Sequence, residues 1–349
     1  MIDLICGARP NFMKVDPIIR SLKTPVRLVH TGQHYDYSMS GSFFDQLGLP
    51  RPDINLGVGS STVTVQTAEI MKAYEPVFIQ GKPDAVVVVG DVNSTLACVL
   101  TAVRYSTPTV HVEAGLRSFD RTMPEEINRL LTDQISDMLL ITSSEARDNL
   151  LREGRPESAI SMVGNPMIDT LFRLLPEAEK IAVPEGDYGL VTLHRPGNVD
   201  EREKLGEILR ALGSLSPVKL VFPAHPRTVK NMEKWGLSRI IPDNLEIVKP
   251  MDYLKFIRHQ QGAAVVITDS GGVQEETSVM GVPCVTVRPN TERPVTCTLG
   301  TNILCPEPGG ISDAVREQID KRPGEPPVIP MWDGKAGSRI ADVIERLLK

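Results

Sequence analysis

The sequence predicts an α/β protein that contains two doubly wound parallel sheets. Short apolar runs rich in valine and isoleucine alternate with helix-like segments from one end of the chain to the other, which is typical of parallel sheets. The length of 349 residues suits about two domains, each with a full core. We therefore expect one sheet in each half of the chain.

The expected strands are short, and most of them stop at a glycine or a polar residue. In chain order they are 2–6, 26–30, 85–89, 109–112, 138–141, 189–193, 219–222, 245–248, 264–267, 284–287 and 302–304. A strand-like run ends in the turn residues Gly164-Asn165-Pro166, which indicate a domain boundary. We expect a first domain over 1–166, a second over 167–333, and a last helix, 338–349, that packs back on the first domain.

Composition and missing motifs argue against several classes of function. The formal charge is −6, from 38 basic and 44 acidic residues without a long run of either sign, which argues against a nucleic-acid or acidic-membrane surface. Five cysteines without a C-x-x-C spacing indicate a reduced, cytoplasmic protein, and neither a signal peptide nor a membrane span is visible. Because the sequence lacks a P-loop, a complete G-x-G-x-x-G fingerprint and a metal-ligand motif, we assign it no metal and no cofactor.

Polar side chains follow the strands of both halves. Asp91 and Glu113 come after strands of the first half, and His194 and Asp269 come after strands of the second. Open α/β sheets bind ligands outside the carboxyl ends of their strands. We therefore expect a ligand in a cleft between the two domains.

The stretch Thr268-Asp269-Ser270-Gly271-Gly272-Val273-Gln274-Glu275-Glu276 joins a buried strand to a helix that ends at Gly281. A turn with two glycines exposes backbone N–H groups and the helix dipole adds positive charge, so the stretch can bind a diphosphate. Glu276 lies about one helical turn farther on, where a carboxylate can accept hydrogen bonds from ribose hydroxyls. The alternative is an ordinary strand-to-helix turn with Asp269 or Ser270 as N-cap.

Three cations and a histidine are further candidates for contact with a phosphate. Arg9 and Lys14 lie near the start of the first expected helix, where positive charge opposes the helix dipole, so we prefer a phosphate-binding role to a solvated helix end. Arg293 lies in the loop after the strand 284–287 and can reach the nucleotide. His194 is either structural or a donor or general acid beside the phosphate.

Asp91 and Glu113 are the candidate acid–base pair. An ionised Asp91 at the apolar edge of a strand either caps the next helix or takes part in chemistry. The strand period of two places His111 and Glu113 on one face. Two carboxylates at neighbouring strand ends can flank one ligand, which suits proton transfer.

The segment after this pair has two interpretations. Thr122-x-x-Glu125, ahead of an apolar-periodic helix, has the spacing of a capping box, and Glu125 and Arg129 can pair on a helix surface. Alternatively Glu125, Glu126 and Arg129 support the acid–base pair or take part in catalysis.

A set of motifs runs through the chain in order. They are Gly7-Ala8-Arg9-Pro10 with Lys14, Thr31-Gly32-Gln33-His34-Tyr35-Asp36, Gly90-Asp91, His111-Val112-Glu113-Ala114-Gly115-Leu116-Arg117, Pro124-Glu125-Glu126-Ile127-Asn128-Arg129, Leu193-His194-Arg195, Asp269–Glu276 and Thr291-Glu292-Arg293-Pro294. Together these motifs resemble the UDP-N-acetylglucosamine 2-epimerase family, in its non-hydrolysing branch, over nearly the whole chain.

The resemblance implies a GT-B fold: two Rossmann-like domains, a deep cleft and a last helix that crosses back to the first domain. It implies that the protein interconverts UDP-N-acetylglucosamine and UDP-N-acetylmannosamine without a cofactor, as a cytoplasmic homodimer that supplies surface-polysaccharide synthesis. It also implies catalytic roles for Asp91, Glu113, Glu125, Arg129 and His194. The residues that it implies for UDP binding are Arg9, Lys14, His194, Phe256, Ser270, Gly271, Gly272, Glu276 and Arg293.

The implied route eliminates UDP to a 2-acetamidoglucal and returns it with protonation on the other face of the sugar. The C2 hydrogen is barely acidic, and departure of UDP builds positive charge at C1 that acidifies it. Asp91 and Glu113 can serve the two faces, while cations, amides and His194 hold the detached UDP.

Two features depart from the pattern of many bacterial members. Gln33-His34-Tyr35-Asp36-Tyr37 differs from their Gln-His-Arg-Glu/Gln-Met, which belongs to a site for activation by a second UDP-N-acetylglucosamine, so we do not expect such activation. Met251 stands where a glutamine beside the uracil is frequent. The Tyr35-Asp36 form also occurs in relatives that act on diacetamido uronic acid sugars, which leaves the C3 and C6 substituents open. The competing functions are a hydrolysing epimerase, a GT-B glycosyltransferase and a sensor without turnover.

Overall fold

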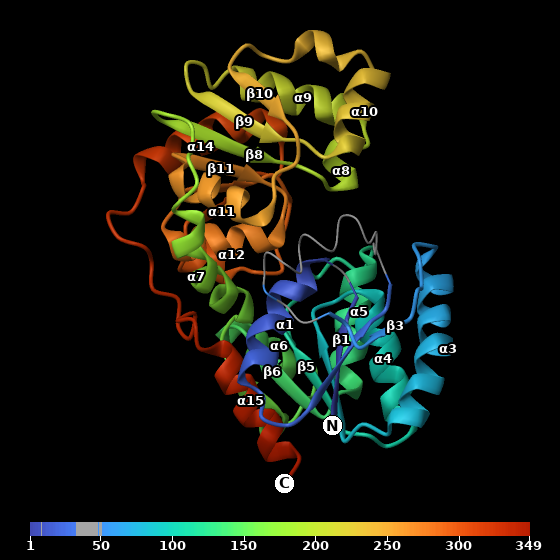
Figure 1. Ribbon diagram of the computed structural model, residues 1–349. Helices are drawn as coiled ribbons and strands as arrows, with labels where there is room; N and C mark the ends of the chain where they lie inside the picture. Colours follow the sequence, from blue (N-terminus) through green and yellow to red (C-terminus); the bar gives the residue numbers. More distant parts are fainter. Residues whose placement is uncertain (8, 33–47, 49–50) are drawn as a thin grey trace. The chain divides into compact units, whose positions relative to one another are not determined.

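The computed structural model describes residues 1–7, 9–32, 48 and 51–349, and the side chains of Arg9 and Pro10 lie outside this description. The chain forms two compact units, each with a sheet of its own (Figure 1). Unit 1 comprises Met1–Arg173 and Pro330–Lys349, and unit 2 comprises Leu174–Ile329. Two doubly wound, Rossmann-like units confirm the predicted fold class, the GT-B type.

Unit 1 is built on a seven-stranded parallel sheet of the order β3-β2-β1-β4-β5-β6-β7. Its strands are β1 (Ile2–Cys6), β2 (Val26–His30), β3 (Ile54–Asn55), β4 (Ala85–Val89), β5 (Thr109–Val112), β6 (Met138–Ile141) and β7 (Ile160–Met162). The strands expected in the first half are all present with the expected bounds. The short edge strand β3 is an addition that the sequence did not indicate.

The helices of unit 1 cover both faces of this sheet. They are α1 (Arg9–Ser21), α3 (Val63–Gly81), α4 (Asn93–Arg104), α5 (Pro124–Ile135), α6 (Ser144–Arg152), the short 3-10 helix Glu157–Ala159, α7 (Pro166–Ala178), whose last part belongs to unit 2, and α15 (Ala336–Leu347). Apolar side chains of α3 and α4 pack on one face of β1, β2 and β4. Among the described residues, no helix is both long enough and apolar enough to cross a membrane.

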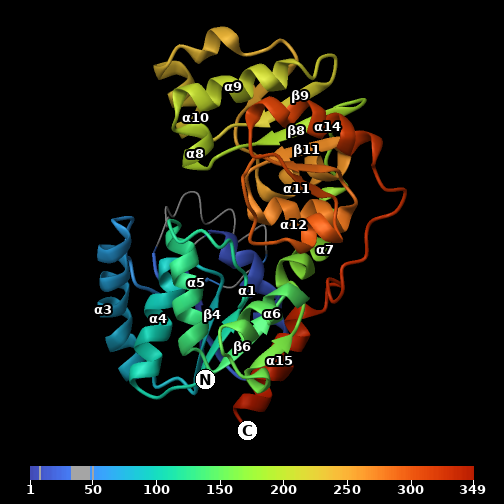
Figure 2. The same cartoon turned by 180° about the vertical axis from the view of Figure 1, so that it is seen from behind.

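The last helix, α15, lies beside α1 in unit 1 (Figures 1 and 2). Its first turn is held by Asp169, whose carboxylate accepts from the backbone N–H groups of Ala336 at 3.0 Å and Gly337 at 2.7 Å. Near its other end the Glu345 carboxylate accepts from the backbone N–H of Thr24 at 2.8 Å. These bonds join the last helix to α7 and to the loop between α1 and β2.

Unit 2 repeats the same topology with a six-stranded parallel sheet of the order β10-β9-β8-β11-β12-β13. Its strands are β8 (Tyr188–Thr192), β9 (Lys219–Pro223), β10 (Leu245–Val248), β11 (Val265–Thr268), β12 (Cys284–Thr286) and β13 (Asn302–Leu304), within one residue of the expected bounds at each end. Its helices are α8 (Pro196–Val199), α9 (Arg202–Gly213), α10 (Pro226–Lys234), Leu237–Ile240, α11 (Tyr253–Gly262), α12 (Gly271–Met280), α13 (Val295–Thr298), Pro308–Gly310 and α14 (Ile311–Asp320).

In both sheets the strand order reverses beside the first strand of the unit. β1 lies between β2 and β4, and β8 lies between β9 and β11. Connections from the two strands at such a point leave on opposite faces, so the carboxyl end of the sheet opens there for a ligand. The loops at these two points carry most of the predicted site residues.

Candidate active site

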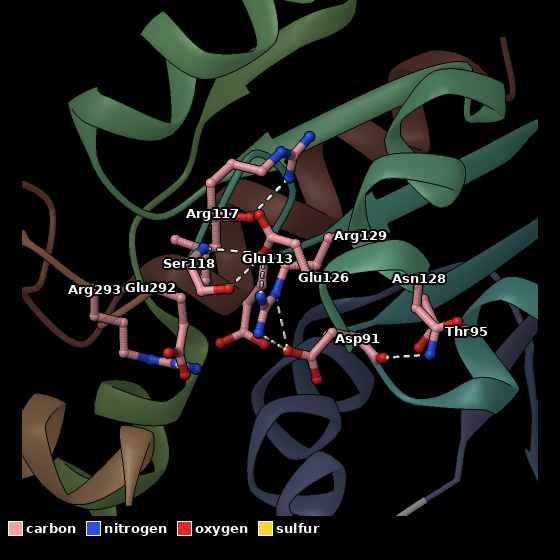
Figure 3. Close-up of polar contacts among 12 residues, drawn as sticks. Asp91, Thr95, Glu113, Arg117, Ser118, Glu126, Asn128, Arg129, Glu292 and Arg293 are labelled. Atoms are coloured by element: carbon pink, nitrogen blue, oxygen red, sulfur yellow. Dashed lines mark hydrogen bonds and ion pairs between the residues drawn. The ribbon is translucent and has the colours of Figure 1, made fainter. Parts of the chain in front are cut away.

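Asp91 lies in the turn after β4, where two residues of α5 hold it. The Arg129 guanidinium donates from Nε, at 3.0 Å, and from Nη2, at 2.5 Å, to Asp91 Oδ2, and the Asn128 amide donates to the Asp91 carbonyl oxygen at 2.9 Å (Figure 3). Val92 and not Asp91 occupies the N-cap position of α4, so the alternative of Asp91 as the N-cap residue is wrong. The Asp91 side chain is 29 % exposed, so a ligand can reach a carboxylate whose orientation is fixed.

Glu113 follows β5 with a left-handed backbone, at a φ of +69°, which is uncommon for a residue with a side chain. The predicted strand face shared with His111 is therefore wrong, because β5 ends at Val112. The buried Glu113 carboxylate forms an ion pair with the ammonium group of Lys14 from α1. Lys14, which was expected to bind a phosphate, thus contacts a candidate catalytic carboxylate.

Gly90 allows the two carboxylates to come close. Its φ of +73° suits glycine, and a Cβ atom at this position would lie 3.3 Å from Glu113 Oε2. The Gly90 backbone N–H also donates to the Val112 carbonyl at 3.0 Å. The structure therefore packs the Glu113 carboxylate against the turn that carries Asp91.

The helix α5 turns a polar face toward the interior of unit 1. Its buried residues are Glu126, Asn128, Arg129, Thr132 and Asp133. The prediction of an apolar-periodic helix is therefore wrong. The buried face of α5 is polar and holds the site residues in position, whereas an ordinary helix would pack apolar side chains on this face.

The start of α5 also differs from the predicted capping box. The helix begins at Pro124 with Met123 as N-cap, and no side chain caps it. The Thr122 hydroxyl instead donates to Asp120 Oδ1 at 2.6 Å, within the preceding turn. The spacing of Thr122 and Glu125 thus reflects a turn and not a cap.

Glu126 is a buried carboxylate in the first turn of α5, whereas Glu125 is partly exposed. Glu126 accepts from the backbone N–H groups of Ser118 and Phe119, both at 2.9 Å, and from the Ser118 hydroxyl at 3.0 Å. It also pairs with Arg129 Nη1 at 2.6 Å, as Figure 3 shows. Glu126 therefore links the turn 118–119 to the arginine that holds Asp91, and a catalytic role for Glu125 stays a prediction.

In unit 2, His194 follows β8 and is oriented by Asp269, which follows β11. Asp269 is fully buried and accepts from the backbone N–H groups of His194 at 3.1 Å and Arg195 at 2.9 Å, and from the Asn198 amide at 3.1 Å. His194 Nδ1 lies 3.0 Å from Asp269 Oδ1, with half of the side chain exposed. Burial raises the pKa of Asp269, but His194 and the other donors outweigh it and hold the pKa below its usual value. An ionised aspartate therefore fixes the ring and leaves Nε2 as the nitrogen for a ligand.

The glycine turn after Asp269 opens the helix α12. Ser270 occupies the N-cap position without a side-chain bond, and the helix proper starts at Gly271 and Gly272. A Cβ atom on Gly271 would lie 2.6 Å from Arg293 Nη1, so only glycine fits beside this arginine. Ser270 is thus the N-cap that the alternative named, but its side chain makes no capping bond, and the bare helix start keeps its capacity for an anion.

Arg293 belongs to a buried cluster of charges in unit 2. It contacts Glu292 through Nη1 and Glu275 through Nε, the latter at 2.7 Å (Figure 3 labels Arg293 and Glu292). Arg288 pairs with Glu292 at 2.8 Å, and Arg195 Nη2 lies 3.8 Å from the same carboxylate. Burial and the charge of Arg288 lower the pKa of Arg195. The arginines outnumber the glutamates of this cluster, which favours an anionic ligand nearby.

Glu276, predicted to bind ribose hydroxyls, is buried in α12. Its carboxylate accepts from the Tyr253 hydroxyl and from the Gln260 amide, both at 2.7 Å. Burial raises its pKa to about 7, although these two donors act in the opposite direction. Phe256 and Met251 pack against one apolar cluster on the same side of the sheet of unit 2.

Some predicted residues fall partly or wholly outside the described chain. Arg9 begins α1, but its side chain is not described, and the motif 33–37 lies outside the described residues. In the part that is described, no three His, Cys, Asp or Glu side chains gather as a metal site requires.

Sequence reasoning missed the positioning residues Asn128 and Asp133, and it named Asp269 as part of the diphosphate turn or as an N-cap but not as the residue that orients His194. Asp269 directly follows a buried strand, and this position was the available signal for a residue that orients its neighbours. The buried positions of Asn128 and Asp133 carried no such signal, because a helix periodicity does not reveal that a buried face is polar.

Comparisons with known proteins identify relatives along the whole chain. A family model described as UDP-N-acetylglucosamine 2-epimerase matches residues 19–345. The chain is 41 % identical to a UDP-N-acetylglucosamine 2-epimerase of Methanocaldococcus jannaschii over 98 % of both proteins. It is 39 % identical to a UDP-2,3-diacetamido-2,3-dideoxy-D-glucuronate 2-epimerase of Pseudomonas aeruginosa, over 98 % of this chain and 99 % of the relative. The crystal structure of the M. jannaschii enzyme in complex with UDP-GlcNAc and UDP matches at 40 % identity with a TM-score of 0.90, covering 99 % of both chains.

Proposed function

This chain belongs to the UDP-N-acetylglucosamine 2-epimerase family, and we propose that it is a non-hydrolysing 2-epimerase. The reaction interconverts UDP-N-acetylglucosamine and UDP-N-acetylmannosamine, which differ only in configuration at C2. It needs no cofactor, because the proton leaves and returns at the same carbon and no electron is transferred. Support comes from relatives named for this activity and from the site of unit 1.

The observation that carries the proposal is the pair of carboxylates at neighbouring strand ends. Asp91 is partly exposed and oriented by Arg129, and Glu113 packs against the same turn while paired with Lys14. Inversion at C2 requires removal of a proton from one face of the sugar and delivery of a proton to the other. Two carboxylates at neighbouring strand ends, each held by a different cation, suit this task.

The groups of unit 2 suit the nucleotide part of the substrate. The start of α12 offers backbone N–H groups and a positive dipole end to the diphosphate. Arg293 adds donors for the charge that develops on UDP as it leaves, and the Nε2 nitrogen of His194 adds another when the ring is protonated on both nitrogens. Glu276 is positioned in α12 as an acceptor for the ribose hydroxyls, in exchange for its present bonds to Tyr253 and Gln260.

The chemistry is an elimination followed by its reverse on the other face. The bond between C1 and the UDP oxygen breaks with its electron pair on UDP, a carboxylate takes the C2 proton, and a C1–C2 double bond forms in 2-acetamidoglucal. UDP then attacks C1 again while a proton is added to C2 from the opposite face. Atoms and charge balance without any external reagent.

Product analysis tests the proposal against the hydrolysing alternative. Incubation with UDP-N-acetylglucosamine followed by ion-exchange separation should yield UDP-N-acetylmannosamine, with UDP at no more than the amount of enzyme. Stoichiometric UDP together with free N-acetylmannosamine would identify a hydrolysing epimerase instead. A product that forms only after an acceptor is added would favour a glycosyltransferase. Binding of the sugar nucleotide with no product, whether or not an acceptor is added, would indicate a sensor.

A second candidate substrate is a UDP-diacetamido uronic acid sugar. The relative from Pseudomonas aeruginosa named for this substrate is 39 % identical, close to the 41 % of the relative named for UDP-N-acetylglucosamine. Since the elimination involves only C1 and C2, the same carboxylates serve both substrates. The ratio of kcat/KM for the two substrates distinguishes them.

We further propose that the enzyme works as a cytoplasmic homodimer and supplies precursors for surface polysaccharides. The family to which the chain belongs supports this proposal. Sedimentation at several protein concentrations tests this assembly, and a monomer throughout would exclude it.

A further inference from the structure

His111 is fully buried in β5, and both of its ring nitrogens contact acceptors. Nδ1 lies 2.6 Å from Asp133 Oδ1, and Nε2 lies 2.8 Å from the Gly90 carbonyl oxygen. A backbone carbonyl only accepts, so Nε2 carries a proton. An ionised carboxylate also only accepts, so the state of Asp133 decides whether Nδ1 carries a second proton.

The surroundings of Asp133 keep it ionised. Asp133 Oδ2 accepts from the Gly115 backbone N–H at 3.0 Å and from Arg117 Nη2 at 2.7 Å. Burial raises the pKa of Asp133, but the contacts with His111 and Arg117 outweigh burial and the pKa lies below its usual value. The Arg117 guanidinium is always charged, so it favours the ionised carboxylate whatever the state of His111. Each ring nitrogen of His111 therefore faces a group that accepts, which is the geometry of a ring that donates from both nitrogens.

These bonds join the two turns that carry the candidate carboxylates. Gly90, whose carbonyl accepts from His111, directly precedes Asp91, and Gly115, whose N–H is held by Asp133, follows Glu113 by two residues. Gly90, Glu113 and Gly115 all have left-handed backbones, with φ of +73°, +69° and +78°. Of these residues only Glu113 carries a side chain, and such a residue keeps a left-handed backbone only where its surroundings hold it.

We propose that His111 is a positioning residue for the epimerisation, and that it acts as a doubly protonated ring that ties the Asp91 turn to the Glu113 turn. This inference rests on the proposed roles of Asp91 and Glu113. The competing interpretation is a buried histidine that only stabilises the fold. The two differ in whether loss of the ring changes the rate more than it changes stability or binding.

The charge on the ring is tested first, on the wild-type protein with ¹⁵N-labelled histidine. Each of the other histidines is substituted in turn, and the ring signal that persists in all of these variants is assigned to His111. We expect two protonated ring nitrogens at neutral pH. A ring with a single protonated nitrogen would overturn the proposal, and this result does not depend on whether the protein turns over any substrate.

The kinetic test compares His111→Gln with Thr109→Val, a change at the other end of the same strand. Thr109 is also fully buried, and its hydroxyl donates to Asp137 at 2.9 Å, away from both turns. Both variants should lose stability, but only His111→Gln should lose C2 exchange, by about 100-fold in kcat, because small misplacements of reacting groups cost that much. The affinity for UDP-N-acetylglucosamine should stay within about threefold, since the nucleotide groups lie in unit 2.

Equal rate losses in the two variants, or a rate in His111→Gln close to wild type, would overturn the positioning role. If His111→Gln does not fold, the wild-type spectrum and the variant Asp133→Asn decide. That variant removes the ionised acceptor, and we expect a ring with one protonated nitrogen and a similar loss of kcat. A wild-type protein without C2 exchange would instead refute the proposed function and leave the charge of His111 unaffected.

Discussion

Arg129 holds Asp91 through two donors on one oxygen, with Nε at 3.0 Å and Nη2 at 2.5 Å from Asp91 Oδ2. The arginine side chain is 4 % exposed, whereas that of the aspartate is 29 % exposed. The cation is thus a fixed part of unit 1, and the carboxylate presents a fixed orientation to a ligand. This relationship separates a residue that positions from the residue that we propose to react.

The first prediction concerns this pair. Arg129→Lys keeps the charge but loses the rigid guanidinium, so Asp91 becomes free to rotate and kcat for C2 exchange should fall by about tenfold to 100-fold. Arg339→Lys is the matched control. Arg339 lies on α15, and its two Nη atoms donate to the Asp333 carboxylate at 2.9 and 2.5 Å. Equal rates for the two variants would show that the orientation of Asp91 does not matter.

Asp91→Asn tests whether Asp91 itself reacts. The amide keeps the shape but cannot take a proton, so the C2 exchange rate should fall by about 10²- to 10⁴-fold. UDP affinity, measured by calorimetry, should be nearly unchanged. Exchange close to the wild-type rate would remove Asp91 from the catalytic groups.

Glu126→Gln and Glu125→Gln distinguish the buried carboxylate of α5 from its partly exposed neighbour. Glu126 is paired and almost fully buried, so its loss should cost about 3–5 kcal/mol in the free energy of unfolding by urea. Glu125→Gln should change this free energy by less than about 0.5 kcal/mol. If Glu125→Gln nevertheless abolishes C2 exchange, the predicted catalytic role of Glu125 is confirmed, and unchanged exchange rejects it.

Glu276 predicts a pH dependence of stability. Its pKa rises from an ordinary 4.5 to about 7, so in this window the folded protein keeps a proton that the unfolded chain releases. The stability of the ligand-free protein should therefore fall as pH rises through the window, by a few kcal/mol at most. Glu276→Gln should remove this trend in urea unfolding. A wild-type slope equal to that of the variant would contradict the raised pKa.

The sheets were predictable because buried parallel strands are continuous apolar runs, and the segments 2–6 and 85–89 have no other reasonable interpretation. β3 was missed because two residues are too few to show a pattern. The short, regular connections then placed Asp91, Glu113 and His194 at strand ends, where the structure has them.

The partners of these residues were less predictable. Lys14 was expected on a phosphate and lies on Glu113, because sequence shows which groups are charged but not which of them meet. The polar face of α5 was hidden for a similar reason. Asn128, Arg129 and Asp133 have ordinary spacing on a helix, and only the turns that they contact explain why they are buried.

The most direct test of the proposed epimerisation is proton NMR of UDP-N-acetylglucosamine incubated with the enzyme in heavy water. We expect the C2 proton signals to disappear as deuterium enters, while the signals of UDP-N-acetylmannosamine grow and free UDP does not accumulate. A C2 proton signal that persists through a long incubation, with no second sugar nucleotide formed, would contradict the elimination and re-addition at this site.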